Sequence, residues 1–357
     1  MFHVNTINSD FLNLFMSARN TWIEAARSEL KHENPLQQLQ KQWREWSIKP
    51  YYDIDDRPSF NLIQKLEIPH KSSNGWLNIP IVSTKADDFN ALAVSHLNSG
   101  SDGVLFQLSG SAPLKEVLGT IKPEFCFLGF EADAKQLNFF LDSDSLLRPE
   151  EKVYGAIFWN DTPEWLKIAR LFKSYSHFRC FGIRVGTLDA ENIERSFRDS
   201  IAALDELTDN TFPALHVLPK FAFRVTGTGN FFLDVAMIRS IKILFQRLVS
   251  AYGVSEIPAF VQYEAQSSIP SSYDQYGIMI SNALSALCAV SASADAISIQ
   301  VENQNSKLHQ HTARSISVLL KEESKLDKVN DPLAGSYFIE SLTQSIVEKI
   351  WANLRNS

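Results

Sequence analysis

Cysteine, glycine and positive charge are all scarce in this sequence of 357 residues. Its three cysteines, Cys126, Cys180 and Cys288, are widely spaced among apolar residues, so neither a disulfide framework nor a Cys-x-x-Cys metal site is predicted. We expect buried thiols in a reducing compartment. A net charge of -7 and a pI near 5.7, without any run of Lys or Arg, argue against binding to nucleic acid or to an anionic membrane.

Long apolar runs and familiar catalytic motifs are also missing. No stretch reaches the roughly 18 apolar residues of a membrane span, and the N-terminus lacks a basic start, so we expect a soluble, cytoplasmic protein. The sequence has no Gly-x-Ser-x-Gly, His-Glu-x-x-His or P-loop motif, which excludes the hydrolase and kinase chemistries that use them. His309 and His311 would point to different sides of a predicted helix, and no metal site is predicted.

Residues 1–75 predict an N-terminal helix followed by an extended arm. Apolar residues recur at helical spacing from Ser9 to about Leu39. In the next segment, WREWSIKPYYDIDDRPSF, prolines and aspartates oppose regular structure while aromatic residues favour burial. The arm is therefore expected to lie over another surface, either a partner or its own barrel, through Trp43, Trp46, Tyr51 and Tyr52.

From residue 76 onward, short apolar runs alternate with segments of helical periodicity. Eight such units predict a closed (β/α)8 TIM barrel over residues 76–328, and residues 329–357 add a C-terminal turn and helix. The predicted strands are 76–83, 103–110, 125–132, 153–160, 178–186, 221–227, 259–266 and 296–302.

The alternation within these strands separates an outer set of side chains from an inner one. The outer set should be the more apolar, as Val104 and Phe106 illustrate, which leaves a small and charged interior. A buried charge needs a partner, so the inner arginines must meet inner glutamates or a ligand. Either these charges form an ionic network that fills the barrel, or they form a binding site. The charged inner residues are Glu131, Arg184, Arg224, Glu264 and Glu302. Cys180 is also predicted to point inward.

Two further places could carry chemistry. Tyr263, Glu264 and Gln266 end the seventh predicted strand on the usual functional face of such barrels, where Glu264 could act as an acid or base or could neutralise an arginine. Gly227-Thr228-Gly229 lies between a strand and a helix, where backbone N–H groups could receive a phosphate, or it is an ordinary βα loop.

Several longer stretches carry specific motifs. They are ISVLLKEESKLDKVNDPLAGSYFIESLT, NFFLDVAMIRSIKILF, AQSSIPSSYDQYG, and TWIEAARSEL with SIKPYYDIDD. Together they resemble the cobalamin-dependent acyl-CoA mutases, specifically the methylmalonyl-CoA mutase family, over nearly the whole chain. The resemblance implies a (β/α)8 barrel whose polar, small-residue interior lets the pantetheine of coenzyme A thread along the axis.

Three departures from the family pattern concern catalysis. Catalytic subunits carry Arg-Gln-Tyr-Ala-Gly, whose tyrosine lies against the substrate, where this chain reads IPIVSTKADD. Matching Gln266, Ser267 and Ser268 to the family's His-x-Gln-Thr-Ser-Gly puts Glu264 in place of the histidine that polarises the thioester, and a carboxylate there would repel an oxyanion. The Asp-x-His-x-x-Gly stretch that supplies the lower cobalt ligand is absent, so no cobalamin-binding domain is expected.

These features resemble the small, non-catalytic subunit of a heterodimeric methylmalonyl-CoA mutase, barrel part only. Such a chain would bind no cofactor itself and would support a catalytic large subunit that isomerises methylmalonyl-CoA and succinyl-CoA with adenosylcobalamin. One alternative is an active acyl-CoA mutase barrel that works with a separate cobalamin-binding protein. Another is an acyl-CoA-binding module without turnover, which would use Arg184 and Arg224 for phosphates. The partner could also be a second copy, in a homodimer, and we expect the chain alone to be inactive.

Overall fold

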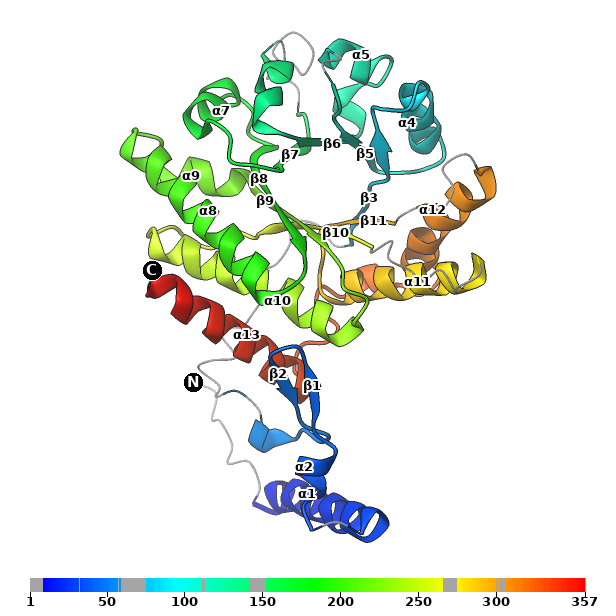
Figure 1. Cartoon of the computed structure of the whole chain (residues 1–357), viewed down its shortest axis with the longest axis vertical. Helices are drawn as coiled ribbons and strands as arrows, with labels where there is room; N and C mark the ends of the chain where they lie inside the picture. The colour runs from blue at the N-terminus through cyan, green and yellow to red at the C-terminus, as the bar shows by residue number, and fades with distance from the viewer. Residues whose placement is uncertain are drawn as a thin grey trace, which may run out of the picture.

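A computed structural model of the chain describes residues 9–31, 33–56, 58, 75–110, 113–141, 152–265, 275–299, 301 and 306–356. In this part of the chain, nine parallel strands form one sheet in the order β3-β11-β10-β9-β8-β7-β6-β5-β4 (Figure 1). The strands are β3 (Leu77–Asn78), β4 (Ile81–Ser83), β5 (Gly103–Gln107), β6 (Phe127–Ala132), β7 (Gly155–Trp159), β8 (Phe178–Thr187), β9 (Phe221–Thr226), β10 (Phe260–Glu264) and β11 (Ala296–Ser298).

The two ends of this sheet belong to one stretch of chain. β3 pairs with β11 and β4 pairs with β5, and only Ile79 and Pro80 separate β3 from β4. The backbone stays hydrogen-bonded there, because Ile79 N donates to Ile297 O at 2.9 Å and Leu105 N donates to Pro80 O at 2.9 Å. The ring of strands is therefore closed, and the predicted (β/α)8 barrel with its eight strands is confirmed.

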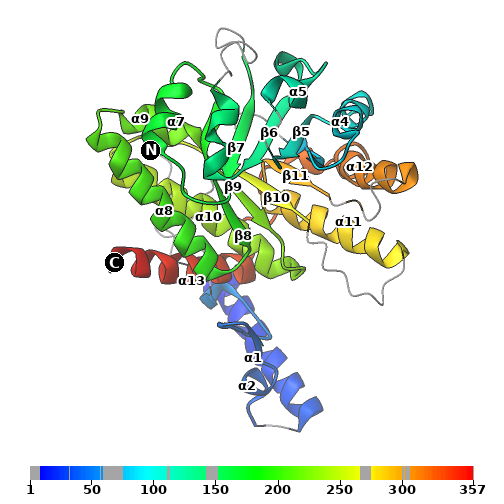
Figure 2. The ribbon, with the colours of Figure 1, turned by 45° about the horizontal axis from the view of Figure 1, so that its top comes forward.

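Helices surround the ring of strands, as expected for a barrel (Figures 1 and 2). No helix among the described residues is both long and apolar enough to cross a bilayer. The helices of the barrel are α4 (Phe89–Asn98), α5 (Leu114–Leu118), α7 (Trp165–Leu171), α8 (Ala190–Asp209), α9 (Ala214–Val217), α10 (Phe231–Ala251), α11 (Gln275–Ser291) and α12 (Lys307–Glu322), with 3-10 turns at Pro123–Phe125, Ala134–Phe140, Leu218–Lys220 and Leu326–Lys328.

The larger apolar core lies between the strands and these helices. Val104 and Phe106 are fully buried in it, as the alternation predicts. Cys180 belongs to the same outer core, so its inward assignment was wrong. The register shifts between Ala156 and Phe158, where β7 pairs with β8, and such an irregularity breaks the period of two.

A second apolar cluster occupies the inside of the ring. Its large members include Leu105, Phe127, Phe158 and Phe260, and the rings of Phe127 and Phe260 stack with centroids 5.5 Å apart. The expectation of a small and charged interior was therefore wrong for this layer. The strands that supply it are apolar on both faces, so alternation alone could not show that large residues point inward.

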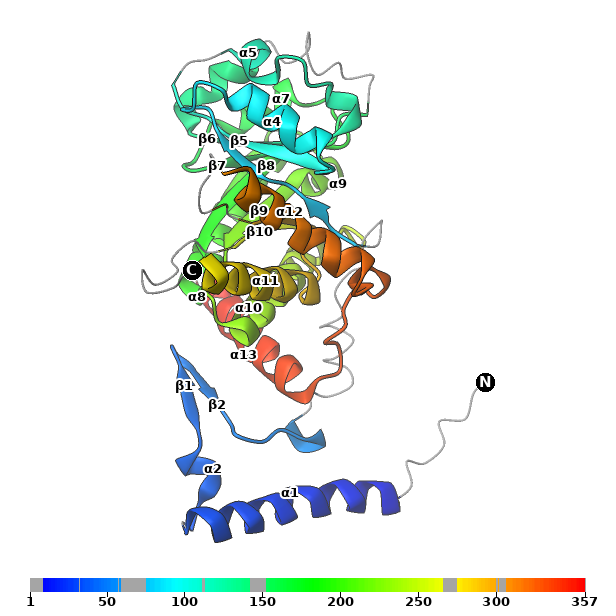
Figure 3. The same ribbon diagram turned by 90° about the vertical axis from the view of Figure 1, so that its right-hand side faces the viewer.

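The N-terminal segment folds beside the barrel and not within it. Its elements are α1 (Ser9–Leu30), α2 (Pro35–Gln38), the antiparallel pair β1 (Lys41–Trp43) and β2 (Trp46–Ile48), and a 3-10 turn at Ile54–Asp56. Figure 3 shows α1 projecting away from the barrel. The last helix, α13 (Tyr337–Arg355), packs on α10 and α8 and lies between the barrel and this segment (Figure 1).

Candidate functional site

The carboxyl ends of the strands bring a group of charged side chains to one end of the barrel. Glu131 comes from β6, Arg184 from β8, Arg224 from β9 and Glu264 from β10. Parallel strands end at the same edge of a sheet, so residues far apart in sequence meet there. Of the predicted charged group, only Glu302 lies outside the described residues, and Gln266 lies outside them as well.

Arg224 joins two glutamates across the inside of the barrel. Its Nη2 lies 2.8 Å from Glu264 Oε2, and its Nη1 is paired with Glu131 Oε2. β9 and β6 are separated in the sheet by β8 and β7, so the Arg224–Glu131 pair crosses the interior. The Arg224 side chain is only 1% exposed, and both glutamates are buried. This is a largely self-satisfied ionic bridge on the axis.

Glu131 has further partners toward the solvent. Arg184 Nη1 lies 3.0 Å from Glu131 Oε1, and Gln107 Nε2 donates to Glu131 Oε2 at 2.8 Å. Burial raises the pKa of Glu131, but the charges and hydrogen bonds of Arg224, Arg184 and Gln107 lower it more, so the net shift is downward. Arg184 also donates to Asn160 Oδ1 at 3.2 Å and is 40% exposed. Glu131 is therefore held as a carboxylate, unsuited to donating a proton.

Tyr263 does not share a face with its neighbour Glu264. Its side chain lies in the outer core, 1% exposed, and its hydroxyl donates to Asp234 Oδ2 at 3.2 Å. Burial raises the pKa of Tyr263 well above its ordinary value, and Cys288 and Asp234 add to the shift. Successive strand residues point to opposite faces, so Tyr263 and Glu264 cannot act on one ligand inside the barrel.

The Gly227-Thr228-Gly229 loop already holds an anion of its own chain. The carboxylate of Asp234, in the first turn of α10, accepts from Thr228 N at 2.8 Å, Thr228 Oγ1 at 2.6 Å and Gly229 N at 3.3 Å. A Cβ on Gly227 would lie 1.9 Å from the Tyr263 hydroxyl, so the close packing requires glycine. These donors serve the turn itself, and the structure favours the βα-loop interpretation over a phosphate site.

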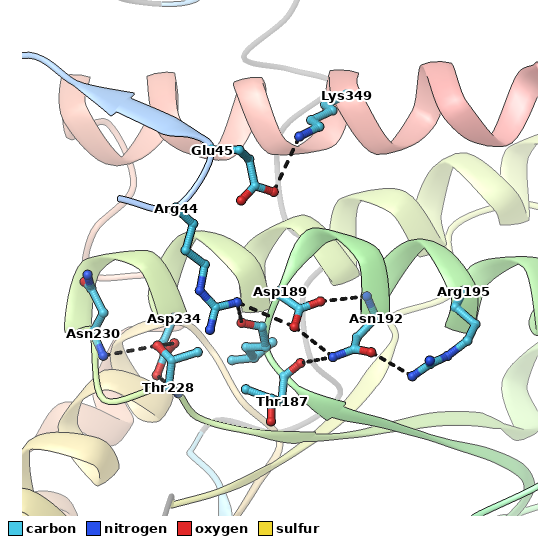
Figure 4. A network of polar contacts seen from close by, with 11 residues as sticks. Arg44, Glu45, Thr187, Asp189, Asn192, Arg195, Thr228, Asn230, Asp234 and Lys349 are labelled. Atoms are coloured by element: carbon cyan, nitrogen blue, oxygen red, sulfur yellow. Dashed lines mark hydrogen bonds and ion pairs between the residues drawn. The ribbon is translucent and has the colours of Figure 1, made fainter. Parts of the chain in front are cut away.

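The N-terminal arm contacts the barrel near the same end (Figure 4). Arg44 Nη1 lies 3.5 Å from Asp189 Oδ2 and donates to Leu188 O at 3.3 Å, at the start of α8. Lys349 of α13 lies 4.9 Å from the centre of the Trp46 ring. Trp43 and Tyr52 both contact the ring of Phe338 in α13. Trp43, Trp46 and Tyr52 thus pack on α13 of their own chain, beside the predicted barrel, and Tyr51 stacks on Trp22 of α1 with ring centres 5.3 Å apart.

The motif VNDPLAGSY connects α13 to the barrel. Arg239 of α10 is 1% exposed, and its guanidinium pairs with Asp331 and, at 2.8 Å, with Glu340 Oε1. Gly335, at φ +83°, donates its N–H to the same Glu340 oxygen at 3.0 Å. Sequence reasoning missed this cluster, although two of the resembling stretches, NFFLDVAMIRSIKILF and the one around Asp331, supply it.

The described residues include no group of three or more His, Cys, Asp or Glu side chains that could hold a metal ion. At the carboxyl end of the barrel, the structure shows carboxylates and guanidiniums paired with each other. These groups already neutralise one another within the chain, so none of them is assigned as a ligand to a cobalamin.

Sequence comparison with known proteins finds similarity to methylmalonyl-CoA mutases. A sequence model described as methylmalonyl-CoA mutase matches residues 184–356. The chain is 24% identical, over 94% of its length and 62% of the relative, to a methylmalonyl-CoA mutase small subunit from Porphyromonas gingivalis. It is 28% identical, over 41% of its length and 24% of the relative, to the small subunit from Propionibacterium freudenreichii subsp. shermanii. The chain thus spans less than two thirds of either relative.

Comparison with solved structures gives only weak similarity. A dihydropteroate synthetase is 10% identical, with a TM-score of 0.40 over 80% of this chain and 99% of that one. A likeness of that size carries no functional argument.

Proposed function

We propose that this chain, which matches a methylmalonyl-CoA mutase sequence model over residues 184–356 and is similar to small subunits of that mutase, is a non-catalytic subunit that supports a larger catalytic subunit. The larger subunit would hold the acyl-CoA substrate and adenosylcobalamin. The two relatives reported above are named as small subunits of this mutase, which supports the pairing.

The observation that carries the proposal is the filled barrel axis. A barrel that turns over acyl-CoA in the family manner needs room for pantetheine along its axis. Here Phe127, Phe158 and Phe260 belong to the apolar cluster inside the ring, and the Arg224 bridge to Glu131 and Glu264 crosses the interior. Opening this path would strip buried charges of their partners, which costs several kcal/mol.

The chemistry at Glu264 supports the same proposal. The resemblance puts Glu264 where a catalytic chain has a histidine that polarises the thioester. In the structure its carboxylate accepts from Arg224 Nη2 at 2.8 Å, so it neutralises a buried cation. An oxyanion next to this carboxylate would be repelled and not stabilised.

The acyl-CoA-binding alternative has one feature in its favour. At the amino ends of the strands lies a pocket of about 470 Å³, lined by Arg179 and Lys321 among others. Asp102, Glu124 and Asp295 line the same pocket, however, so carboxylates outnumber the cations that phosphates would need. The subunit proposal is therefore preferred.

Co-expression with the large mutase subunit from the same genome, followed by size-exclusion chromatography, tests the pairing. We expect the two chains to co-elute, and the purified chain alone to isomerise no methylmalonyl-CoA when adenosylcobalamin is added. Turnover by the chain alone would overturn the non-catalytic assignment. Failure to associate, combined with calorimetric binding of an acyl-CoA, would support the binding module.

A further inference from the structure

Arg179, near the start of β8, lines the pocket of about 470 Å³ at the amino ends of the strands. Its guanidinium lies 4.5 Å from the centre of the Phe260 ring. No ion pair or side-chain hydrogen bond in the described part of the chain includes this guanidinium. Burial lowers the pKa of Arg179, and the charge of Asp295 opposes this shift only in part. The pocket therefore contains a desolvated cation without a carboxylate partner.

The acidic side chains that line the pocket are either neutralised or solvated. Asp295 is paired with the buried Lys242, whose Nζ lies 2.7 Å from Asp295 Oδ2. Asp102 and Glu124 are exposed to solvent. Electrostatic interactions are stronger where water is excluded, so Arg179 is the charge that a ligand inside the pocket meets most strongly.

Aromatic side chains supply much of the remaining lining. Phe127 and Phe260 line the pocket and stack with ring centres 5.5 Å apart. Phe125 and Tyr154, which also line it, are 78% and 45% exposed. Ligand pockets of this size are commonly lined by aromatic residues together with a few polar groups that fix the orientation of the ligand. A flat ring can pack against these side chains.

The shape and charge of the pocket indicate the class of ligand. A guanidinium that lies against an aromatic ring keeps its N–H edge for a planar carboxylate. With Asp295 neutralised, Arg179 and Lys321 balance Asp102 and Glu124. A pocket close to neutral accepts one added negative charge more readily than the several charges of a polyphosphate.

We propose that this pocket binds a small aromatic monocarboxylic acid. The carboxylate of the ligand pairs with Arg179, and its ring lies against Phe125 and Tyr154. The site lies at the opposite end of the barrel from Glu131 and Arg184. It gives a subunit without catalytic residues a ligand of its own, so the inference goes beyond the proposed function.

Isothermal titration calorimetry of the full chain with phenylpropionate tests the site. We expect saturable binding, and phenylpropionamide, the uncharged analogue, should bind at least about tenfold more weakly because it cannot form the ion pair. Arg179→Met should weaken the binding of phenylpropionate by at least about tenfold. Arg195→Met is the matched control, because Arg195 is exposed on α8, and it should leave the affinity unchanged.

Thermal unfolding shows whether the two arginine variants are folded. Phe125→Ala removes only an exposed ring, and it should weaken binding by about threefold or more. Equal affinity for the acid and the amide, or wild-type affinity in a folded Arg179→Met variant, would overturn the proposal.

Thiol labelling of the wild-type chain locates the ligand. Cys126 lines the same pocket, whereas Cys180 and Cys288 are buried in the core. We expect saturating phenylpropionate to slow the labelling of Cys126, followed by mass spectrometry, by at least about threefold, because the bound ligand covers the thiol. No protection, or protection by coenzyme A and not by phenylpropionate, would overturn the proposal.

These measurements use the chain alone and are independent of the large subunit. A chain that co-elutes with a large subunit but binds no phenylpropionate would contradict this site and leave the proposed function intact.

Discussion

At the scale of single residues, Arg224 organises the inner face of the barrel. It is the buried cation between Glu131 and Glu264, and its own strand cannot supply either partner. Arg184, which also pairs with Glu131, is 40% exposed and has solvent as an alternative partner. The two arginines therefore contribute differently to stability. Arg224 forms a buried ion-pair bridge, whereas Arg184 forms an ion pair at the surface.

Replacing Arg224 should be far more harmful than replacing Arg184. Arg224→Met leaves two buried carboxylates without their shared cation, and we expect the free energy of unfolding to fall by about 3–5 kcal/mol. Arg184→Met should lower it by about 1 kcal/mol or less. Urea unfolding of the two variants measures both changes. Equal losses of stability in the two variants would show that the buried Arg224 ion pairs contribute no more to folding than the exposed Arg184 pair.

A buried histidine makes stability depend on pH. His96 of α4 is 3% exposed, and Arg314 Nη1 lies 3.3 Å from its Nδ1. Burial lowers the pKa of His96 to about 4, and the charge of Arg314 lowers it further in the same direction. In the unfolded chain the ring takes up a proton below about pH 6.5, whereas the folded chain resists protonation until about pH 4. The stabilisation of the folded chain that depends on neutral His96 is therefore complete above pH 6.5 and is lost as the pH falls toward 4.

We expect this residue to lower the free energy of unfolding by about 2 kcal/mol between pH 7.5 and pH 5. His96→Gln keeps a hydrogen-bond acceptor for Arg314 but does not titrate, so it should lose less stability over this range. Urea unfolding of the wild type and the variant at both pH values measures the change in free energy of unfolding. Titration of carboxylates affects both proteins alike, so the difference between them is the contribution of His96. The same pH dependence in both proteins would contradict the assignment.

At the scale of elements, the C-terminal helix α13 depends on the Arg239 cluster. Asp331 precedes the helix and Glu340 lies in its first turn, so both ends of the DPLAGSY turn contact one guanidinium of α10. Burial raises the pKa of Asp331, although Arg239 opposes the shift. The helix in turn supports the arm through Phe338 and Lys349. Barrel, helix and arm are thus connected in series.

Glu340→Gln should loosen α13 from α10. The substitution removes a charge from a buried ion pair, and we expect a loss of about 3 kcal/mol. Glu348→Gln is the control, because Glu348 pairs with Arg247 at 2.7 Å but is 49% exposed, and it should cost about 1 kcal/mol or less. Limited proteolysis reports on the element itself: Glu340→Gln should be cut faster within α13 and the arm. Unchanged cleavage would show that the cluster does not hold the helix.

At the scale of the whole molecule, the thiols report on global unfolding. Burial raises the pKa of Cys180 to about 12 and holds the pKa of Cys288 well above its ordinary value. Cys126 is less buried, and burial together with Glu124 raises its pKa to about 11. In the folded chain all three thiols are therefore mostly protonated at pH 8, and two of them are also inaccessible.

A thiol reagent should react slowly with the native chain and rapidly in urea. In a Cys126→Ser variant, we expect the remaining two thiols to react at a rate that follows global unfolding, because both lie in the core. Absorbance of the released reagent measures the rate. Fast labelling of Cys180 or Cys288 in native buffer would indicate that the barrel opens locally.

Much of the architecture could be predicted from the sequence, but the direction in which several strand side chains point could not. Eight apolar runs separated by helical segments were enough to predict the barrel, because that alternation is set locally. The interior was harder: Phe127 and Phe158 lie in strands that are apolar on both faces, so alternation could not assign them. The bulge between β7 and β8 also moved Cys180 to the outer side. Tyr263 and Glu264 are adjacent in sequence but face opposite sides of the sheet.

The sequence by itself determined the repeating βα units, the resemblance to methylmalonyl-CoA mutases and the presence of inner charges that need partners. Each of these depends on short-range periodicity or on local motifs. Only the tertiary structure decided that Arg224 bridges Glu131 and Glu264, that Arg239 meets Asp331 and Glu340, and that Trp46 packs against α13. Those contacts join residues far apart in the chain, and strand stagger, ring closure and helix packing select among the possible partners.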